Sequence, residues 1–135
     1  QLVLASNFSA QYTAVLDYRN KHDCTLVVAE RDILGMDHAE VGGMLASAWR
    51  FPDSLCQAVA EHHAPASALA DSLANVVHIA DTFAHALGLS GSPNELAVAV
   101  DRTAWERLGL DGEKCRKALN EIEHSFEDTC QVLKG

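Results

Sequence analysis

The chain has 135 residues, of which 48% are apolar but only 6% aromatic, and its formal net charge is −9 at pH 7. This length fits one domain with its own core, and we expect a single helical domain over residues 1–135. An acidic surface repels phosphate backbones and anionic lipid, and no apolar run reaches the length of a membrane span, so we expect neither nucleic-acid nor membrane binding.

The periodicity of the apolar residues predicts an all-α fold, a bundle of about six to seven helices. Few prolines and many small apolar residues favour helices over strands. In chain order, we expect helices over residues 9–20, 25–34, 37–49, 52–64, 69–87, 101–108 and 111–133, with a loop at 88–94. Trp49 and Trp105, at helix ends, are expected to anchor the core or an interface.

The starts and ends of the first helices can be predicted from capping residues. Ser9 is the expected N-cap of the first helix, and Gly35 is a natural residue to end the second. Asp23 is expected to cap the second helix. We therefore interpret the adjacent pair His22-Asp23 as a junction between helices and not as a functional dyad.

The clearest helix start is the segment Asp37-His-Ala-Glu40. Asp37 at the N-cap and Glu40 three residues later form the capping-box pattern, with Asp in place of the usual Ser or Thr. Gly42 and Gly43 inside this helix each cost about 1 kcal/mol relative to Ala. That cost is tolerable where another backbone packs closely, and we expect such a contact here.

The four cysteines show no CxxC pair and no zinc-ribbon spacing. Their spread through amphipathic segments is typical of buried thiols in a reducing compartment, which predicts a cytoplasmic location.

The residues with most chemical interest are imidazoles and a carboxylate from three separate predicted helices. Such groups are the ligand types of a divalent transition metal. The candidate ligands are His38, His62, His63 and Asp81. His78 and His85 lie within about 60° of Asp81 around the same helix, so these three side chains could face one cleft. The alternative stays open, because seven histidines in 135 residues produce some neighbours by chance.

Three segments carry a resemblance to a known family. They are ERDILGMDHAEVGGMLASAWRFP at residues 30–52, AVAEHHAP at 58–65 and LANVVHIAD at 73–81. In order they contain an acidic residue, LG-x-DH-x-x-x-G, a Trp before a Pro, HH-x-P and an apolar-AD segment. This pattern resembles the HDOD family, the output-domain relatives of the HD phosphohydrolases, most clearly over residues 30–86.

The resemblance implies an α-helical fold of the HD superfamily. In the hydrolases of that superfamily, His and Asp side chains hold metals that activate water against a phosphoester. His38, His62, His63 and Asp81 match later ligand positions of that site. The His-Asp dyad of the superfamily is expected upstream of Gln1, and no GYP segment follows His63. We therefore expect the chain to be the C-terminal part of an HDOD unit from a longer signalling protein.

Three hypotheses about function follow. The first is a non-catalytic regulatory module of bacterial signal transduction, as in response regulators, which needs no cofactor and binds a partner protein or another domain of its own chain. A homo-oligomer is compatible with it. The second is a metal-dependent phosphohydrolase acting on a nucleotide or cyclic dinucleotide, which uses a divalent metal. The third is a small-molecule sensor with a cleft between the helices at 37–49 and 69–87.

Overall fold

The computed structural model describes residues 2–89, 96 and 99–134, and every regular element in this part of the chain is a helix. The all-α prediction is therefore confirmed. The elements in chain order are α1 (Leu2–Asn7), α2 (Ser9–His22), α3 (Leu26–Leu34), α4 (His38–Ala48), α5 (Asp53–Glu61), the 3-10 helix η1 (Pro65–Ser67), α6 (Leu73–Ala86), α7 (Arg102–Arg107) and α8 (Gly112–Lys134). Among them, no helix is long and apolar enough to cross a membrane.

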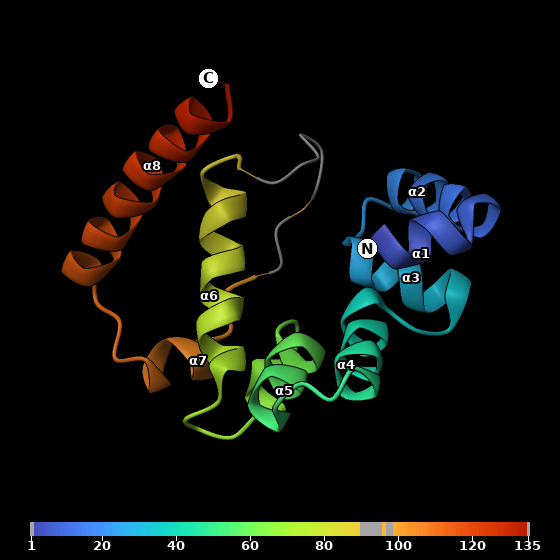
Figure 1. Ribbon diagram of the computed structural model, residues 1–135, viewed down its shortest axis with the longest axis horizontal. Coiled ribbons are helices and arrows are strands. Elements are labelled where there is room, and N and C mark those ends of the chain that lie inside the picture. Colours follow the sequence, from blue (N-terminus) through green and yellow to red (C-terminus); the bar gives the residue numbers. More distant parts are fainter. Residues whose placement is uncertain (1, 90–95, 97–98, 135) are drawn as a thin grey trace.

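The helices follow one another along the long axis of the molecule. Helices α1–α3 lie at one end, α4 and α5 in the middle, and α6–α8 at the other end (Figure 1). α2 packs against α3, α4 against α5 and α5 against α6. A small core between α2 and α3 consists of Val15, Leu26 and Ala29, all buried. These contacts place the start of α4 beside the end of α5.

Two glycines let α4 and α5 approach each other closely. A Cβ atom on Gly42 would lie 2.7 Å from Cγ1 of Val59, and one on Gly43 would lie 2.7 Å from Cβ of Ala60. Both distances are below van der Waals contact, so any larger residue would push the helices apart. The expected close approach is confirmed, and it explains why two residues of low helix propensity occupy this helix.

The N-terminal junctions differ from the predicted ones. Ser9 is the first residue of α2, and Phe8 occupies the N-cap without a side-chain hydrogen bond. Asp23 does not cap α3. It ends α2 in a left-handed conformation, φ 49° and ψ 50°, which Asp tolerates better than most residues. Thr25 caps α3 instead, through a hydrogen bond from the Val28 amide to its hydroxyl.

Further along the chain, the helix expected from residue 69 begins only at Leu73. Pro65 starts the short 3-10 helix η1, and the Ser72 side chain then caps α6 by accepting from the Ala74 amide. Trp49 is not a core anchor, because 66% of it is exposed. The expected loop at 88–94 lies outside the described residues from position 90 on.

An arginine helps to join the last helices to the middle of the chain. Nη1 of Arg107, in α7, donates to the carbonyls of Pro65 and Ala68, each at 3.0 Å, and to Oδ1 of Asn75 at 3.3 Å. Asn75 is fully buried in α6. α7 is thereby fastened to η1 and α6, while α8 extends from it along α6 (Figure 1).

Candidate functional site: a histidine cluster

The cap of α4 determines where His38 lies. Oδ1 of Asp37 accepts from the amides of Ala39 and Glu40, at 2.8 and 2.9 Å, and Oε2 of Glu40 accepts from the Asp37 amide at 3.1 Å. The predicted capping box is therefore present in full. It fixes the first turn of α4, and His38 is the first helical residue after the cap.

Asp37 is a fully buried carboxylate with a cationic partner. The guanidinium of Arg31 lies 2.6 Å from its Oδ2. Burial by itself would raise the pKa of the Asp37 carboxyl, but the Glu40 and Ala39 amides and the Arg31 guanidinium lower it by more. The pKa of Asp37 therefore lies below its usual range, and the cap carries a negative charge at neutral pH.

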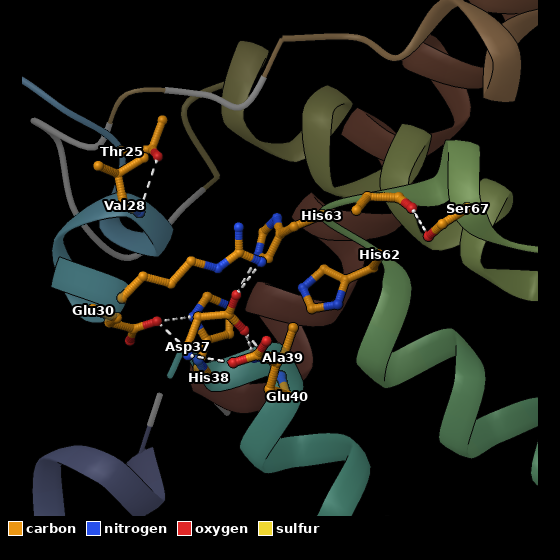
Figure 2. A network of polar contacts seen from close by, with 12 residues as sticks. Thr25, Val28, Glu30, Asp37, His38, Ala39, Glu40, His62, His63 and Ser67 are labelled. Atoms are coloured by element: carbon orange, nitrogen blue, oxygen red, sulfur yellow. Dashed lines mark hydrogen bonds and ion pairs between the residues drawn. The ribbon is translucent and has the colours of Figure 1, made fainter. Parts of the chain in front are cut away.

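His62 and His63 come to the same place from the end of α5. His62 is the residue that ends this helix, and His63 follows it. Nε2 of His63 lies 2.9 Å from Nε2 of His38, and the His62 and His63 ring centroids are 3.9 Å apart. Figure 2 shows the rings of His62 and His63 turned toward that of His38. Each of the three offers a ligand nitrogen, and these nitrogens all lie within 4.8 Å of one another.

Hydrogen bonds decide which ring nitrogens face the cluster. Nδ1 of His38 lies 2.6 Å from Oε2 of Glu30, and Nδ1 of His62 lies 2.7 Å from the carbonyl oxygen of Val59. A carboxylate and a carbonyl only accept, so both Nδ1 atoms carry the proton. In the neutral rings, Nε2 of His38 and of His62 is then the atom left to accept a hydrogen bond or bind a cation.

Burial keeps two of the rings neutral. Burial, and after it the nearby His62 and His38 rings, lowers the pKa of His63 to about 3. Burial likewise lowers the pKa of His62. Neutral imidazole is the form of histidine that binds metals, so these rings are ready ligands at neutral pH.

The donor set fits a transition metal. Imidazole nitrogens suit zinc, copper, iron and nickel, whereas magnesium and calcium prefer oxygen ligands. Nδ1 of His63 is also buried, with no hydrogen-bond partner among the described residues. The three histidines could therefore hold a metal, with Glu30 hydrogen-bonded to the far side of one of them.

Asp81 lies outside this group of three. It is half-buried on α6, and its Oδ1 is 3.5 Å from Nδ1 of His85. Its negative charge raises the pKa of His62 slightly, against the larger effect of burial, so it acts on the cluster at a distance. Its assignment as a ligand stays a prediction.

His78 does not join Asp81 and His85 as a third ligand candidate. Its ring is 2% exposed, and both nitrogens are occupied. Nδ1 lies 2.8 Å from the carbonyl oxygen of His62, and Nε2 accepts from the Asp101 amide at 2.9 Å. His78 thus connects the end of α5 to the cap of α7, which is a structural role.

The pair His22-Asp23 is separate from the cluster. Nδ1 of His22 hydrogen-bonds to the carbonyl of Tyr18 at 2.9 Å, and its ring stacks on the Tyr18 ring with centroids 3.9 Å apart. This geometry agrees with a junction at the end of α2.

Sequence reasoning missed the role of Glu30 and of Tyr12 behind it. Glu30 is fully buried in α3, and the Tyr12 hydroxyl lies 3.1 Å from its Oε1. A signal was present, because Glu30 follows Leu26 by one helical turn on a face that is otherwise apolar. A carboxylate in such a position needs buried partners, and His38 is one of them.

The comparisons with known proteins agree with this geometry. The family model described as the HDOD domain matches residues 1–65. The resemblance is therefore confirmed for this all-helical part of the chain, from α1 to the start of η1. The match begins before the expected position 30, includes the histidine cluster and ends before Asp81. An HDOD domain is consistent with a signalling output module or with an HD-related phosphohydrolase-like domain. No curated protein and no solved structure matches the sequence.

Proposed function

We propose that this chain is a non-catalytic regulatory module of bacterial signal transduction that acts by contact with a partner protein or with another domain of its own chain. The observation that carries the proposal is the direct hydrogen bond between Nε2 of His38 and Nε2 of His63 at 2.9 Å. It uses the same nitrogens that a metal would need. His38 and His63 therefore form a polar contact between α4 and the end of α5.

The turn between α4 and α5 adds support. Trp49 is 66% exposed and Phe51 is 50% exposed, and their rings meet edge to face with centroids 6.3 Å apart. Arg50 between them adopts a left-handed conformation, φ 59°, which is costly for a residue with a side chain. Exposed aromatic side chains of this kind are enriched at the centres of protein interfaces.

The second candidate is a metal-dependent phosphohydrolase. It is favoured by the convergence of three imidazoles, backed by the buried carboxylate of Glu30. His38, His62 and His63 would hold the metal. A bound metal supplies Lewis acidity and an activated water in such enzymes. The residues of this chain would keep the ligand rings neutral and oriented.

One experiment separates the two candidates. The purified chain and its His38→Ala variant are exposed to zinc, manganese or iron, analysed for bound metal, and assayed with bis(p-nitrophenyl) phosphate and a cyclic dinucleotide. We expect the two proteins to show the same background hydrolysis with every metal. Turnover by the parent chain that is lost in His38→Ala, together with stoichiometric metal, would overturn the regulatory proposal in favour of the hydrolase.

A further inference from the structure

The Glu30 carboxylate makes an unusual set of contacts for a buried acid. Its Oε2 accepts from the His38 amide at 2.9 Å and from Nδ1 of His38 at 2.6 Å, while the Tyr12 hydroxyl reaches its Oε1 at 3.1 Å. Glu30 is 0% exposed, and the His38 side chain is 12% exposed. One carboxylate thus holds the backbone and the ring of the same histidine (Figure 2).

This double contact constrains the His38 ring in two ways. The amide bond fixes the carboxylate relative to the start of α4, and the ring bond then fixes the side chain relative to the carboxylate. Because a carboxylate only accepts, the ring must present Nδ1–H to it. The opposite nitrogen, Nε2, is consequently the one that faces the other two rings, at 2.9 Å from Nε2 of His63.

We propose that Glu30 is the positioning residue of the histidine cluster, which it builds by holding His38 as the Nδ1–H tautomer with Nε2 turned toward His62 and His63. Tyr12 supports Glu30 from α2 through the second carboxylate oxygen. The cluster on α4 and α5 therefore depends on α2 and α3. Only the metal-binding consequence of this inference rests on the second candidate function, because the tautomer exists without a metal.

The test uses a matched set of variants of the whole chain. Glu30→Gln keeps an oxygen that can accept from Nδ1, whereas Glu30→Leu removes the acceptor. Glu40→Leu is the control, because Glu40 belongs to the same helix cap but contacts the Asp37 amide and not the His38 ring. Circular dichroism establishes that each variant folds, and long-range ¹H–¹⁵N correlation spectra report which nitrogen of His38 carries the proton.

We expect His38 to be the Nδ1–H tautomer in the parent chain, in Glu30→Gln and in Glu40→Leu, and to shift toward the Nε2–H tautomer in Glu30→Leu. An Nε2–H tautomer in the parent chain would overturn the inference, and this result does not depend on any variant folding. An unchanged tautomer in Glu30→Leu, or the same shift in Glu40→Leu, would overturn it as well.

Titration with cobalt(II), followed by its visible absorption, extends the test to metal binding. If the parent chain binds cobalt, we expect Glu30→Leu to bind it about 10–100-fold more weakly, as is usual when a partner of a ligand histidine is lost, and Glu40→Leu to bind it as the parent does. Equal affinity in Glu30→Leu would contradict the inference. A parent chain that binds no cobalt counts against the hydrolase candidate alone, and the tautomer measurement then decides about Glu30.

Discussion

The start of α4 and the last helix, α8, are held in place by different means. At the start of α4, contacts run through buried polar groups and closely packed helices: Glu30 and Asp37 are 0% exposed, and Gly43 leaves no space for a Cβ atom. In α8, by contrast, Cys115 is the one buried side chain among those described. An open apolar hollow of about 300 Å³ lies between α6 and α8, lined by side chains such as Phe83 and Ile122.

The difference indicates where a precise site can exist. Ligand geometry must be held within fractions of an ångström, and this requires side chains whose neighbours cannot move. The histidine cluster lies in this closely packed region, where Glu30 of α3 orients His38 and α4 packs closely against α5. Paired substitutions, one in a closely packed contact and one at an exposed site, therefore test this interpretation directly.

The largest effect is expected from Gly43→Val. The new Cβ would lie 2.7 Å from Cβ of Ala60, which is fixed to its own backbone, so α4 and α5 would have to separate. Overpacking of this kind costs about 3 kcal/mol of unfolding free energy. Urea unfolding followed by circular dichroism measures it.

Gly112→Val is the matched control in α8, because nothing lies within 4 Å of a Cβ atom on Gly112. We expect a change within about 0.5 kcal/mol there, as for most surface substitutions. Similar losses in both variants would mean that the contact between α4 and α5 is no tighter than the rest of the molecule, and the comparison would fail.

A smaller effect is expected from Arg107→Met. The substitution keeps much of the side chain's length but removes the donor to two carbonyls and to the buried Asn75. Losing hydrogen bonds from a charged group, and leaving their acceptors unpaired, costs about 2 kcal/mol of unfolding free energy. Thermal unfolding checks this value.

Arg102→Met is its control within the same helix. Arg102 pairs with Glu106 at 2.7 Å, but the two side chains are 90% and 60% exposed. An exposed pair contributes only about 0.5 kcal/mol. If Arg102→Met destabilised the chain as much as Arg107→Met, the hydrogen bonds of Arg107 to η1 and α6 would not be a main contact between the C-terminal end and the middle.

Arg107 also illustrates what the sequence could not predict. Its acceptor at Pro65 is 42 positions away, and no local sequence pattern predicts a contact over that separation. The capping box at Asp37 and the close approach at Gly43 were predictable, because a cap and a glycine act on residues within one or two turns. Glu30 lies between these cases. Its place on an apolar helix face marked it as unusual, but its partner came from the start of another helix.

The same reasoning accounts for the junctions that were predicted wrongly. Asp23 and Ser9 both have side chains that can cap a helix, and the sequence does not reveal that the chain turns one residue earlier or later. Trp49 was expected to anchor the core or an interface, and its exposure of 66% contradicts only the first alternative.

The smallest change in unfolding free energy is expected at the two aspartate caps, Asp37 at the start of α4 and Asp111 at the start of α8. Asn can cap a helix almost as well as Asp, so Asp37→Asn mainly removes the ion pair with Arg31. We expect a loss of about 1 kcal/mol at pH 7. Asp111→Asn should cost less, because its carboxylate is exposed and bonds only to the Glu113 and Lys114 amides among the described groups.

The stability that Asp37 contributes depends on pH in a predictable direction. The pKa of Asp37 is lowered in the folded chain, so on acidification the unfolded state takes up its proton first, at about pH 4, and the folded state only at lower pH. The contribution of Asp37 is thus complete above pH 4 and is lost as the pH falls through the folded pKa. The stability difference between the parent chain and Asp37→Asn should therefore narrow below pH 4. If this stability difference stays constant down to pH 2, the buried charge of Asp37 does not stabilise the cap. The cap of α4 would then be no different in this respect from the exposed cap of α8.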